Sequence, residues 1–274
     1  YGGTTVNGQG KLLTHFLKNA DKLVIPVYQR NYDWKEEHCK KLYFDLVKTV
    51  SEGKRWHFFG GIVSVSDPMG SSSDYLGIDG QQRITTVSLL LLAIANLVKA
   101  GIVTPKDPNL YDVITKKYLV DEINPKQRKM KLKPIKGDQD SYDRLWGDPS
   151  EYNQSSRITQ NYLYFYNQIQ RDDISVDQLF SAVEKLQIID ITLTPPDDDP
   201  QLVFESLNST GLDLNEGDKI RNFVLMRRSM EEQEQFYDDY WSPIEKNAGY
   251  DKQTNSYDVS PFIRDYLGIK ERRL

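Results

Sequence analysis

The greatest concentration of chemically capable side chains lies in the run IDGQQRITT at residues 78–86, between a predicted strand and a predicted helix. Gly80 lets the backbone approach a ligand, and the first helical turn offers N–H groups and a positive dipole end to an anion. Arg83 can grip phosphate oxygens, and Asp79 can hold Mg²⁺ or orient water. The other polar side chains able to contact phosphate, base or water are Gln81, Gln82, Thr85 and Thr86. The alternative is an aspartate cap followed by solvated polar residues.

A second segment combines aromatic rings with a guanidinium directly after a short predicted strand. Its candidate residues are Tyr28, Gln29, Arg30, Tyr32 and Trp34. Aromatic faces stack on nucleobases, and Arg30 can stack or bind phosphate. The alternative is that the rings pack beneath the loop while Arg30 forms an ordinary ion pair.

Two further candidates are more isolated. Asn208 lies in the last turn of a predicted helix, and Gly211 suits a left-handed C-cap. This segment is either a plain helix–turn–helix connection or a turn whose backbone and Asn208 contact a ligand. His57 begins a predicted strand, where a histidine is either structural or a titrating functional group.

Several kinds of site are excluded by what the sequence lacks. It contains no G-x-x-x-x-G-K-[ST], no G-x-G-x-x-G after a strand, no G-x-S-x-G and no H-E-x-x-H. One cysteine and three histidines exclude a disulfide framework and a multi-cysteine zinc site. The same scarcity argues against a self-contained His-Asn-His nuclease.

Charge is distributed unevenly along the chain. The whole chain carries −5, yet residues 116–136 hold eight basic side chains against two acidic ones, a local charge of +6. The alternation RKMKLK at 128–133 predicts one strand with Lys129, Lys131 and Lys133 on the same face. These lysines either protect an edge strand from aggregation or contact a DNA backbone, and the second case predicts salt-sensitive binding.

The elements that must position these residues follow from hydrophobic periodicity. Strands are expected at 23–25, 58–65, 75–78, 128–133 and 186–193, and helices at 12–17, 33–53, 84–98, 110–120, 139–147, 155–171, 175–185, 201–209, 215–230, 232–246 and 258–267. The longest apolar run, 89–94, is far short of the ~20 residues of a membrane span, so no membrane contact and a cytoplasmic location are expected. The predicted fold class is α+β, with a flexible lead at 1–10, a mixed α/β lobe at 11–137 and a mainly helical lobe at 138–274.

Taken together, four segments carry a resemblance to a known family. They are IPVYQRNYDW at 25–34, HFFGG at 57–61, IDGQQRITT at 78–86 and FESLNSTGLDL at 204–214. In this order, over about residues 25–223, they resemble the N-terminal domain of GmrSD-type restriction systems. The resemblance implies a nucleotide-binding fold related to ParB and sulfiredoxin, completed by the helical lobe.

The resemblance also implies a function: a regulatory or sensor module that binds and hydrolyses a nucleoside triphosphate, GTP first among the candidates, with Mg²⁺. Asp79, Gln81, Gln82 and Arg83 would then be catalytic, with Asp79 at the metal. The nucleotide would contact Gly80, Thr85, Thr86, His57, Asn208, Gly211 and the Tyr28–Trp34 candidates. A C-terminal His-Asn-His nuclease, expected outside these 274 residues, would cut modified phage DNA, and a homo-oligomer is allowed. The alternative is a DNA-binding or modification-sensing module in which the nucleotide is regulatory and turnover is absent.

Overall fold

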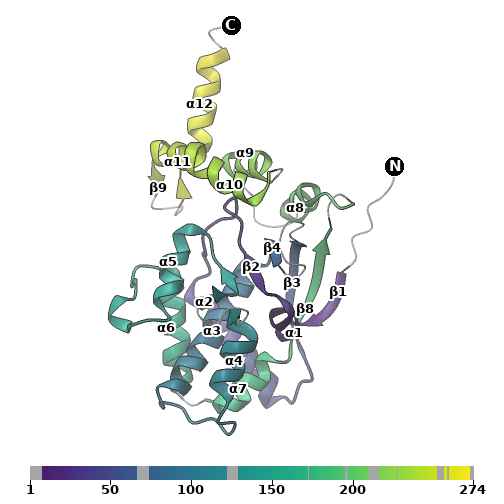
Figure 1. Cartoon of the computed structure of the whole chain (residues 1–274), viewed down its shortest axis with the longest axis vertical. Helices are drawn as coiled ribbons and strands as arrows, with labels where there is room; N and C mark the ends of the chain where they lie inside the picture. Colours follow the sequence, from purple (N-terminus) through teal and green to yellow (C-terminus); the bar gives the residue numbers. More distant parts are fainter. Residues whose placement is uncertain are drawn as a thin grey trace. The chain divides into compact units, whose positions relative to one another are not determined.

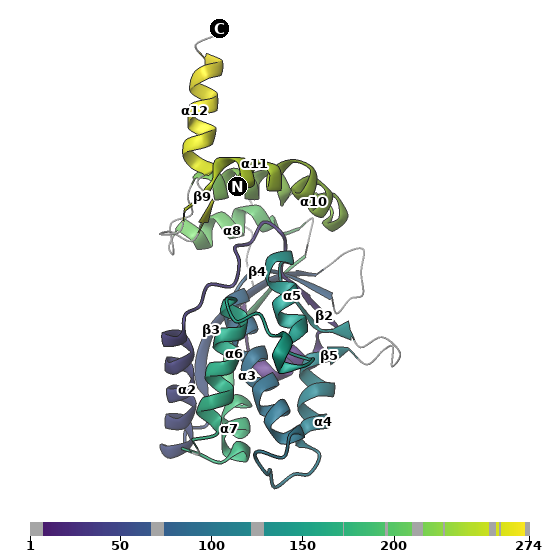
Figure 2. The same ribbon diagram turned by 90° about the vertical axis from the view of Figure 1, so that its left-hand side faces the viewer.

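The computed structural model in Figure 1 and Figure 2 describes residues 8–66, 74–121, 129–171, 173–194, 197–209, 216–226, 228–251, 256–257 and 259–271. Residues 1–7 of the expected lead at 1–10 and the expected turn at 67–73 lie outside these residues, while residues 8–10 belong to a strand, β1 (Gly8–Leu12). The chain divides into two compact units, the first formed by residues 1–26 and 30–198 and the second by 27–29 and 199–274. The predicted α+β class is confirmed.

A six-stranded mixed sheet organises the first unit. Its strands, in spatial order, are β1 (Gly8–Leu12), β8 (Leu186–Leu193), β3 (His57–Ser66), β4 (Asp74–Asp79), β2 (Lys22–Val24) and β7 (Leu132–Lys133). The predicted hairpin of β3 and β4 is antiparallel, whereas β8 pairs with β3 in parallel and with β1 antiparallel. Because β3 lies between β8 and β4, strand β8, from much later in the chain, is separated from β4 by one strand only.

Helices of the first unit build the rest of its core. They are α1 (Leu13–Asn19), α2 (Glu36–Ser51), α3 (Gln81–Lys99), α4 (Leu110–Ile114), a π-helix (Thr115–Leu119), α5 (Lys136–Arg144), a 3₁₀ turn (Pro149–Glu151), α6 (Arg157–Ile169) and α7 (Val176–Val183). Helix α3 packs against α4 and α6, and α2 packs against α6 and α7, as Figures 1 and 2 show. The predicted lobe boundary at 137/138 therefore differs from the observed division, because α5, α6 and α7 share this core.

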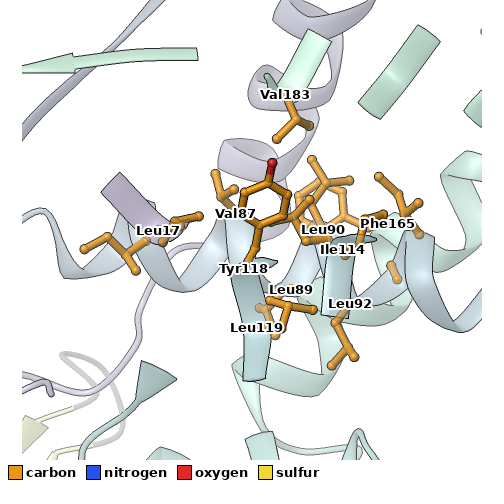
Figure 3. Packing of buried hydrophobic residues seen from close by; sticks show 14 of the residues in the cluster. Leu17, Val87, Leu89, Leu90, Leu92, Ile114, Tyr118, Leu119, Phe165 and Val183 are labelled. Atoms are coloured by element: carbon orange, nitrogen blue, oxygen red, sulfur yellow. The ribbon is translucent and has the colours of Figure 1, made fainter. Parts of the chain in front are cut away.

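Helix α3 is buried on all sides rather than on one face. The periodicity of its sequence predicts a single apolar stripe, yet 15 of its 19 residues are buried. Figure 3 shows Val87, Leu89 and Leu90 of α3 among Leu17 of α1 and Phe165 of α6. Its length and composition would allow it to cross a membrane, but 83% of its most apolar window is buried in the protein, as in the core helix of a globular domain. Because α3 is packed on all sides, the core fixes the position of its first turn.

The lysine-rich segment differs from its prediction. Instead of one strand over 128–133, the structure has β6 (Lys129–Met130), paired with β5 (Val120–Asp121), and the separate strand β7. Lys131 lies between them and is only 6% exposed. Its Nζ donates hydrogen bonds to the carbonyl oxygens of Leu17 and Lys18 at 3.0 and 3.1 Å, and to that of Lys117 at 3.0 Å. The prediction of one solvent-facing row of lysines was wrong, because Lys131 binds the C-terminal carbonyls of α1 and of the π-helix.

The second unit is mainly helical. It comprises α8 (Pro200–Ser209), α9 (Glu216–Leu225), α10 (Met230–Phe236), a π-helix (Tyr237–Trp241), α11 (Ser242–Ala248), the short strands β9 (Tyr250–Asp251) and β10 (Ser256–Tyr257), and α12 (Val259–Glu271). A buried polar cluster joins its helices. Arg221 pairs with Asp218 at 2.9 Å and with Glu245 at 3.2 Å, while Glu245 accepts from Trp241 Nε1 at 2.9 Å and from the Tyr237 hydroxyl at 2.7 Å.

Candidate functional site

The predicted strand–turn–helix passage is present between β4 and α3. Asp79 ends β4, where it pairs with Val63 of β3, and its side chain is exposed. Gly80 follows with φ of +89°, a left-handed conformation that favours glycine. A Cβ on Gly80 would lie 2.9 Å from the carbonyl oxygen of Gly61, so a side chain there would also collide with β3. The turn is thus fixed by both its backbone conformation and its contact with β3.

The two glycines of HFFGG both contact Arg83, but in different ways. Gly60 has φ of +130° and lies beside a register shift in the β3–β8 pairing. A Cβ on Gly60 would lie 2.5 Å from Arg83 Nε and 2.8 Å from its Cζ. Arg83 Nη1 donates to the Gly61 carbonyl oxygen at 3.2 Å. The absence of a side chain at Gly60 therefore allows the half-buried guanidinium to lie across β3 and reach the Gly61 carbonyl oxygen, while its other N–H groups can serve a ligand.

Gln82 is engaged with backbone at both ends of its amide. Its Oε1 accepts hydrogen bonds from the backbone N–H groups of Asp33 at 2.9 Å and Trp34 at 3.1 Å, and its Nε2 donates to the Asn31 carbonyl oxygen at 3.3 Å. The side chain is 8% exposed. Gln82 thereby fixes the loop before α2, a task that the sequence-based catalytic assignment did not include.

Gln81 fixes the start of the same loop. Its Nε2 donates to the carbonyl oxygen of Arg30 at 3.1 Å, which places the Arg30 backbone beside the first turn of α3. The Arg30 side chain is exposed, and its guanidinium forms no ion pair or hydrogen bond within the described residues. The two glutamines thus present a loop that carries a solvent-facing cation.

Tyr32 occupies the centre of a buried hydrogen-bond chain. Asn161 Nδ2 donates to the Tyr32 hydroxyl at 2.9 Å, which lies 2.7 Å from Thr86 Oγ1, and Thr86 donates to the Gln82 carbonyl oxygen at 2.7 Å. Because the Thr86 hydroxyl donates its one hydrogen to the Gln82 carbonyl oxygen, the Tyr32 hydroxyl must be the donor in its bond with Thr86 Oγ1. Burial raises the pKa of Tyr32 far above its ordinary value. Tyr32 and Thr86 are therefore engaged in buried hydrogen bonds, whereas the sequence predicts that both contact nucleotide. Thr85, for which the same contact is predicted, is likewise buried, at 3% exposure.

The backbone N–H of Tyr32 has a further partner, Asp138, which belongs to no sequence motif. Its N–H donates to Asp138 Oδ2 at 2.6 Å, and Asp138 is 8% exposed. Burial raises the pKa of this carboxyl from 3.8 to about 6, while the hydrogen bond from Tyr32 opposes the rise. No motif includes Asp138 or Asn161, and only their spatial convergence on Tyr32 reveals them.

The other aromatic candidates are also used in packing. Trp34 stacks on His38 with centroids 5.2 Å apart and an 18° interplanar angle, and it meets the edge of Phe59. Tyr28 belongs to the second unit, where it packs edge-on against Phe204 at 6.3 Å, and burial raises its pKa strongly. The expectation of free rings for base stacking is therefore not met at Tyr28 and Tyr32, which are 3% and 6% exposed.

The remaining candidates lie apart from the α3 turn or outside what is described. His57 begins β3, and its Nε2 lies 3.6 Å from Asp45 Oδ2 of α2. Four residues separate it from Gly61, roughly 13 Å along a strand. Gln29 belongs to the second unit, as does Asn208, whose side chain is outside the described part, while Gly211 is wholly outside it.

Metal binding at this turn rests on one side chain. The described part of the chain contains no group of three or more His, Cys, Asp or Glu residues that could hold a metal ion. Mg²⁺ is commonly held by one or two carboxylates together with substrate phosphates. The single exposed carboxylate of Asp79 therefore fits a cation that arrives with a phosphate ligand better than it fits a resident metal.

The chain is thus an α+β domain in which the turn between β4 and α3 carries Asp79 and Arg83, next to a loop fixed by Gln81 and Gln82. The sequence profile of the family "GmrSD restriction endonuclease, N-terminal domain" matches residues 13–225, most of the chain. The chain therefore belongs to this family, which places it in a restriction system of anti-phage defence that acts on DNA through a nuclease partner domain. A search of curated proteins gave no significant match.

Proposed function

We propose that this domain binds a nucleoside triphosphate with Mg²⁺ at the first turn of α3 and hydrolyses it as the regulatory step of the restriction system. The observation that carries the proposal is one fixed turn that carries the charged side chains of Asp79 and Arg83 and binds the backbone of a third charged residue, Arg30. Asp79 is exposed at its start, Arg83 lies across Gly60 and Gly61, and Arg30 stands on a loop bound to Gln81. A nucleotide-binding fold related to ParB and sulfiredoxin, and a cytoplasmic location, belong to the same proposal.

Each charged side chain has a role that follows from its place. Phosphoryl transfer requires mainly positioning and stabilisation of negative charge, so a sparse site suffices. Arg83 and the backbone N–H groups after Gly80 hold the phosphates. Arg30 adds a second cation from the loop, and Asp79 orients the attacking water or holds the Mg²⁺ that neutralises the phosphates.

The roles of the two glutamines change relative to the sequence-based assignment. Both amides are engaged with the loop that carries Arg30, and Gln82 uses both ends of its amide. A glutamine that activates water needs an amide directed at the water. Gln81 and Gln82 therefore serve the site by shaping the loop.

The test is a calorimetric titration with GTP, ATP and CTP, each with Mg²⁺, followed by phosphate-release measurements. We expect Arg83→Ala and Asp79→Ala to abolish most of the release, while the exposed control variants Arg144→Ala and Asp112→Ala keep it. Equal release in all five proteins would overturn the proposal. Binding without any release by the wild type would instead support a regulatory nucleotide with no turnover.

We also propose that the lysine-rich segment contacts DNA, but the burial of Lys131 removes this residue from the candidates. Lys129 and Lys133 stay as candidates, and Lys133 is half-buried in β7. Phosphate contacts give an affinity that falls steeply with salt. Charge reversal at Lys133 should therefore lower the affinity for DNA and weaken its dependence on salt. If neither changes, this segment is not part of the DNA interface.

A further inference from the structure

The segment Arg30–Lys35 has no helix or strand, yet its backbone is held by side chains from three helices. Gln81 and Gln82 of α3 bind it from one side. The other contacts come from α5 and α6, through Asp138 and Asn161. A loop of this kind would ordinarily sample many conformations, so this number of anchors needs a reason.

Asp138 binds the loop at its midpoint. Its Oδ2 accepts the Tyr32 backbone N–H at 2.6 Å, a short charge-assisted hydrogen bond. Asp138 forms no ion pair within the described residues, although it is 8% exposed. An unpaired buried carboxylate costs stability, and burial raises its pKa to about 6. A neutral acceptor would satisfy the same N–H at lower cost, and groups maintained at such a cost cluster at functional sites.

Asn161 binds the loop at two further points. Its Nδ2 donates to the Trp34 carbonyl oxygen at 2.6 Å and to the Tyr32 hydroxyl at 2.9 Å. Tyr32 is therefore fixed at its backbone by α5 and at its ring by α6 and Thr86. Together these contacts lock the loop at the residues directly after Arg30.

The locked loop contrasts with the exposed side chain that it carries. Arg30 is exposed, and within the described residues its one hydrogen bond is that of its carbonyl oxygen with Gln81. Fixing the backbone beneath a free cation reduces the entropy lost when that cation binds an anion.

We infer that Asp138 and Asn161 are positioning residues that set the conformation of the Arg30–Trp34 loop and so place the Arg30 guanidinium for a phosphate group of the ligand. The loop-setting role is independent of the ligand, whereas the phosphate contact rests on the proposed function. The two parts can be tested separately.

The first measurement is trypsin cleavage after Arg30, followed by mass spectrometry in the 274-residue chain. Cleavage after Arg55, in the exposed connection between α2 and β3, is the internal reference. We expect Asp138→Ala and Asn161→Ala to raise cleavage at Arg30 about tenfold relative to Arg55, because local opening frees the loop. The exposed control Asp140→Ala, on the same helix as Asp138, should leave the ratio unchanged.

The second measurement is the titration with Mg²⁺ and GTP, ATP or CTP. Binding should weaken about tenfold in Asp138→Ala and recover in Asp138→Asn, which keeps an acceptor for the Tyr32 N–H. Asp138→Asn also gives a folded comparison if the alanine variant fails to fold. Unchanged cleavage after Arg30 in folded Asp138→Ala and Asn161→Ala would overturn the inference. Increased cleavage with no nucleotide binding by the wild type would support the loop-setting role and overturn the proposed function.

Discussion

Arg83 donates from Nη1 to the carbonyl oxygen of Gly61 at 3.2 Å, and its guanidinium passes over a glycine to do so. This contact gives the two glycines at the end of the HFFGG segment a structural role that requires no direct contact with ligand. Gly60 makes room for the guanidinium of a residue more than twenty positions later in the chain, and Gly61 supplies the carbonyl oxygen that accepts from it. This relationship ties the geometry of β3 to the chemistry of the α3 turn.

Gly60→Ala tests this relationship directly. The new Cβ would lie 2.5 Å from Arg83 Nε, at a φ of +130° that side chains rarely adopt. We expect destabilisation of about 1–3 kcal/mol and, with Arg83 displaced, a loss of about 100-fold in phosphate release. Gly10→Ala is the matched control, because nothing lies within 4 Å of its new Cβ. Thermal unfolding measures the loss of stability, and a phosphate-release assay measures the loss of activity. Identical behaviour of the two variants would show that Arg83 does not need a glycine at position 60.

Gln82→Ala separates a structural from a catalytic role. It leaves the N–H groups of Asp33 and Trp34 and the carbonyl oxygen of Asn31 without their partner. We expect a loss of about 1–3 kcal/mol in the free energy of unfolding, measured by denaturant titration, with partial recovery in Gln82→Glu, which keeps the acceptor. Gln9→Ala, at an exposed position of β1, is the control. A variant with full stability but no phosphate release would instead make Gln82 a catalytic residue.

The sequence predicted local features better than distant ones. The β4–α3 turn was predictable because Gly80 and the apolar periodicity of α3 lie next to each other in the chain. The role of Gln82 was not predictable, since its partners Asp33 and Trp34 lie 49 and 48 residues upstream. Similarly, Asp138 belongs to no motif, and its function follows only from the contact with Tyr32 across 106 residues.

Alternation of charge was the least reliable pattern. Lys129, Lys131 and Lys133 alternate along the chain, a pattern that predicts one exposed strand face. Lys131 is instead buried, and it binds carbonyl oxygens of α1 and of the π-helix. A lysine that binds helix C-termini has the same local sequence as one that faces solvent. Only the packing of α1 against the π-helix distinguishes them.

Lys131→Met should therefore act on stability rather than on surface charge. It would leave the carbonyl oxygens of Leu17, Lys18 and Lys117 without their shared donor. We expect a loss of about 2–4 kcal/mol in the free energy of unfolding. Lys116→Met, at an exposed position, should change it by less than about 0.5 kcal/mol. Equal stability of the two variants by denaturant titration would show that the buried contacts of Lys131 contribute little.

The pH dependence of stability tests the burial of Asp138. Its pKa of about 6 exceeds the ordinary value of 3.8, so the folded state binds the proton more tightly than the unfolded state. Between these two values the folded chain carries more bound proton, and the free energy of unfolding must fall as the pH rises through the window. The contribution present below pH 3.8 is lost by about pH 6, and the difference corresponds to about 3 kcal/mol.

Asp138→Asn removes this titration while keeping an acceptor for the Tyr32 N–H. The stability of the variant relative to wild type should therefore rise by about 2 kcal/mol between pH 4 and pH 7, because only the wild type then carries a buried charge. Urea titrations of both proteins at the two pH values measure this difference, and other titrating groups cancel in it. Asp140→Asn, at an exposed position on the same helix, controls for the general effect of removing a carboxylate. A relative stability of Asp138→Asn that does not change with pH would mean that the Asp138 carboxylate is solvated in the folded chain and exerts no cost there.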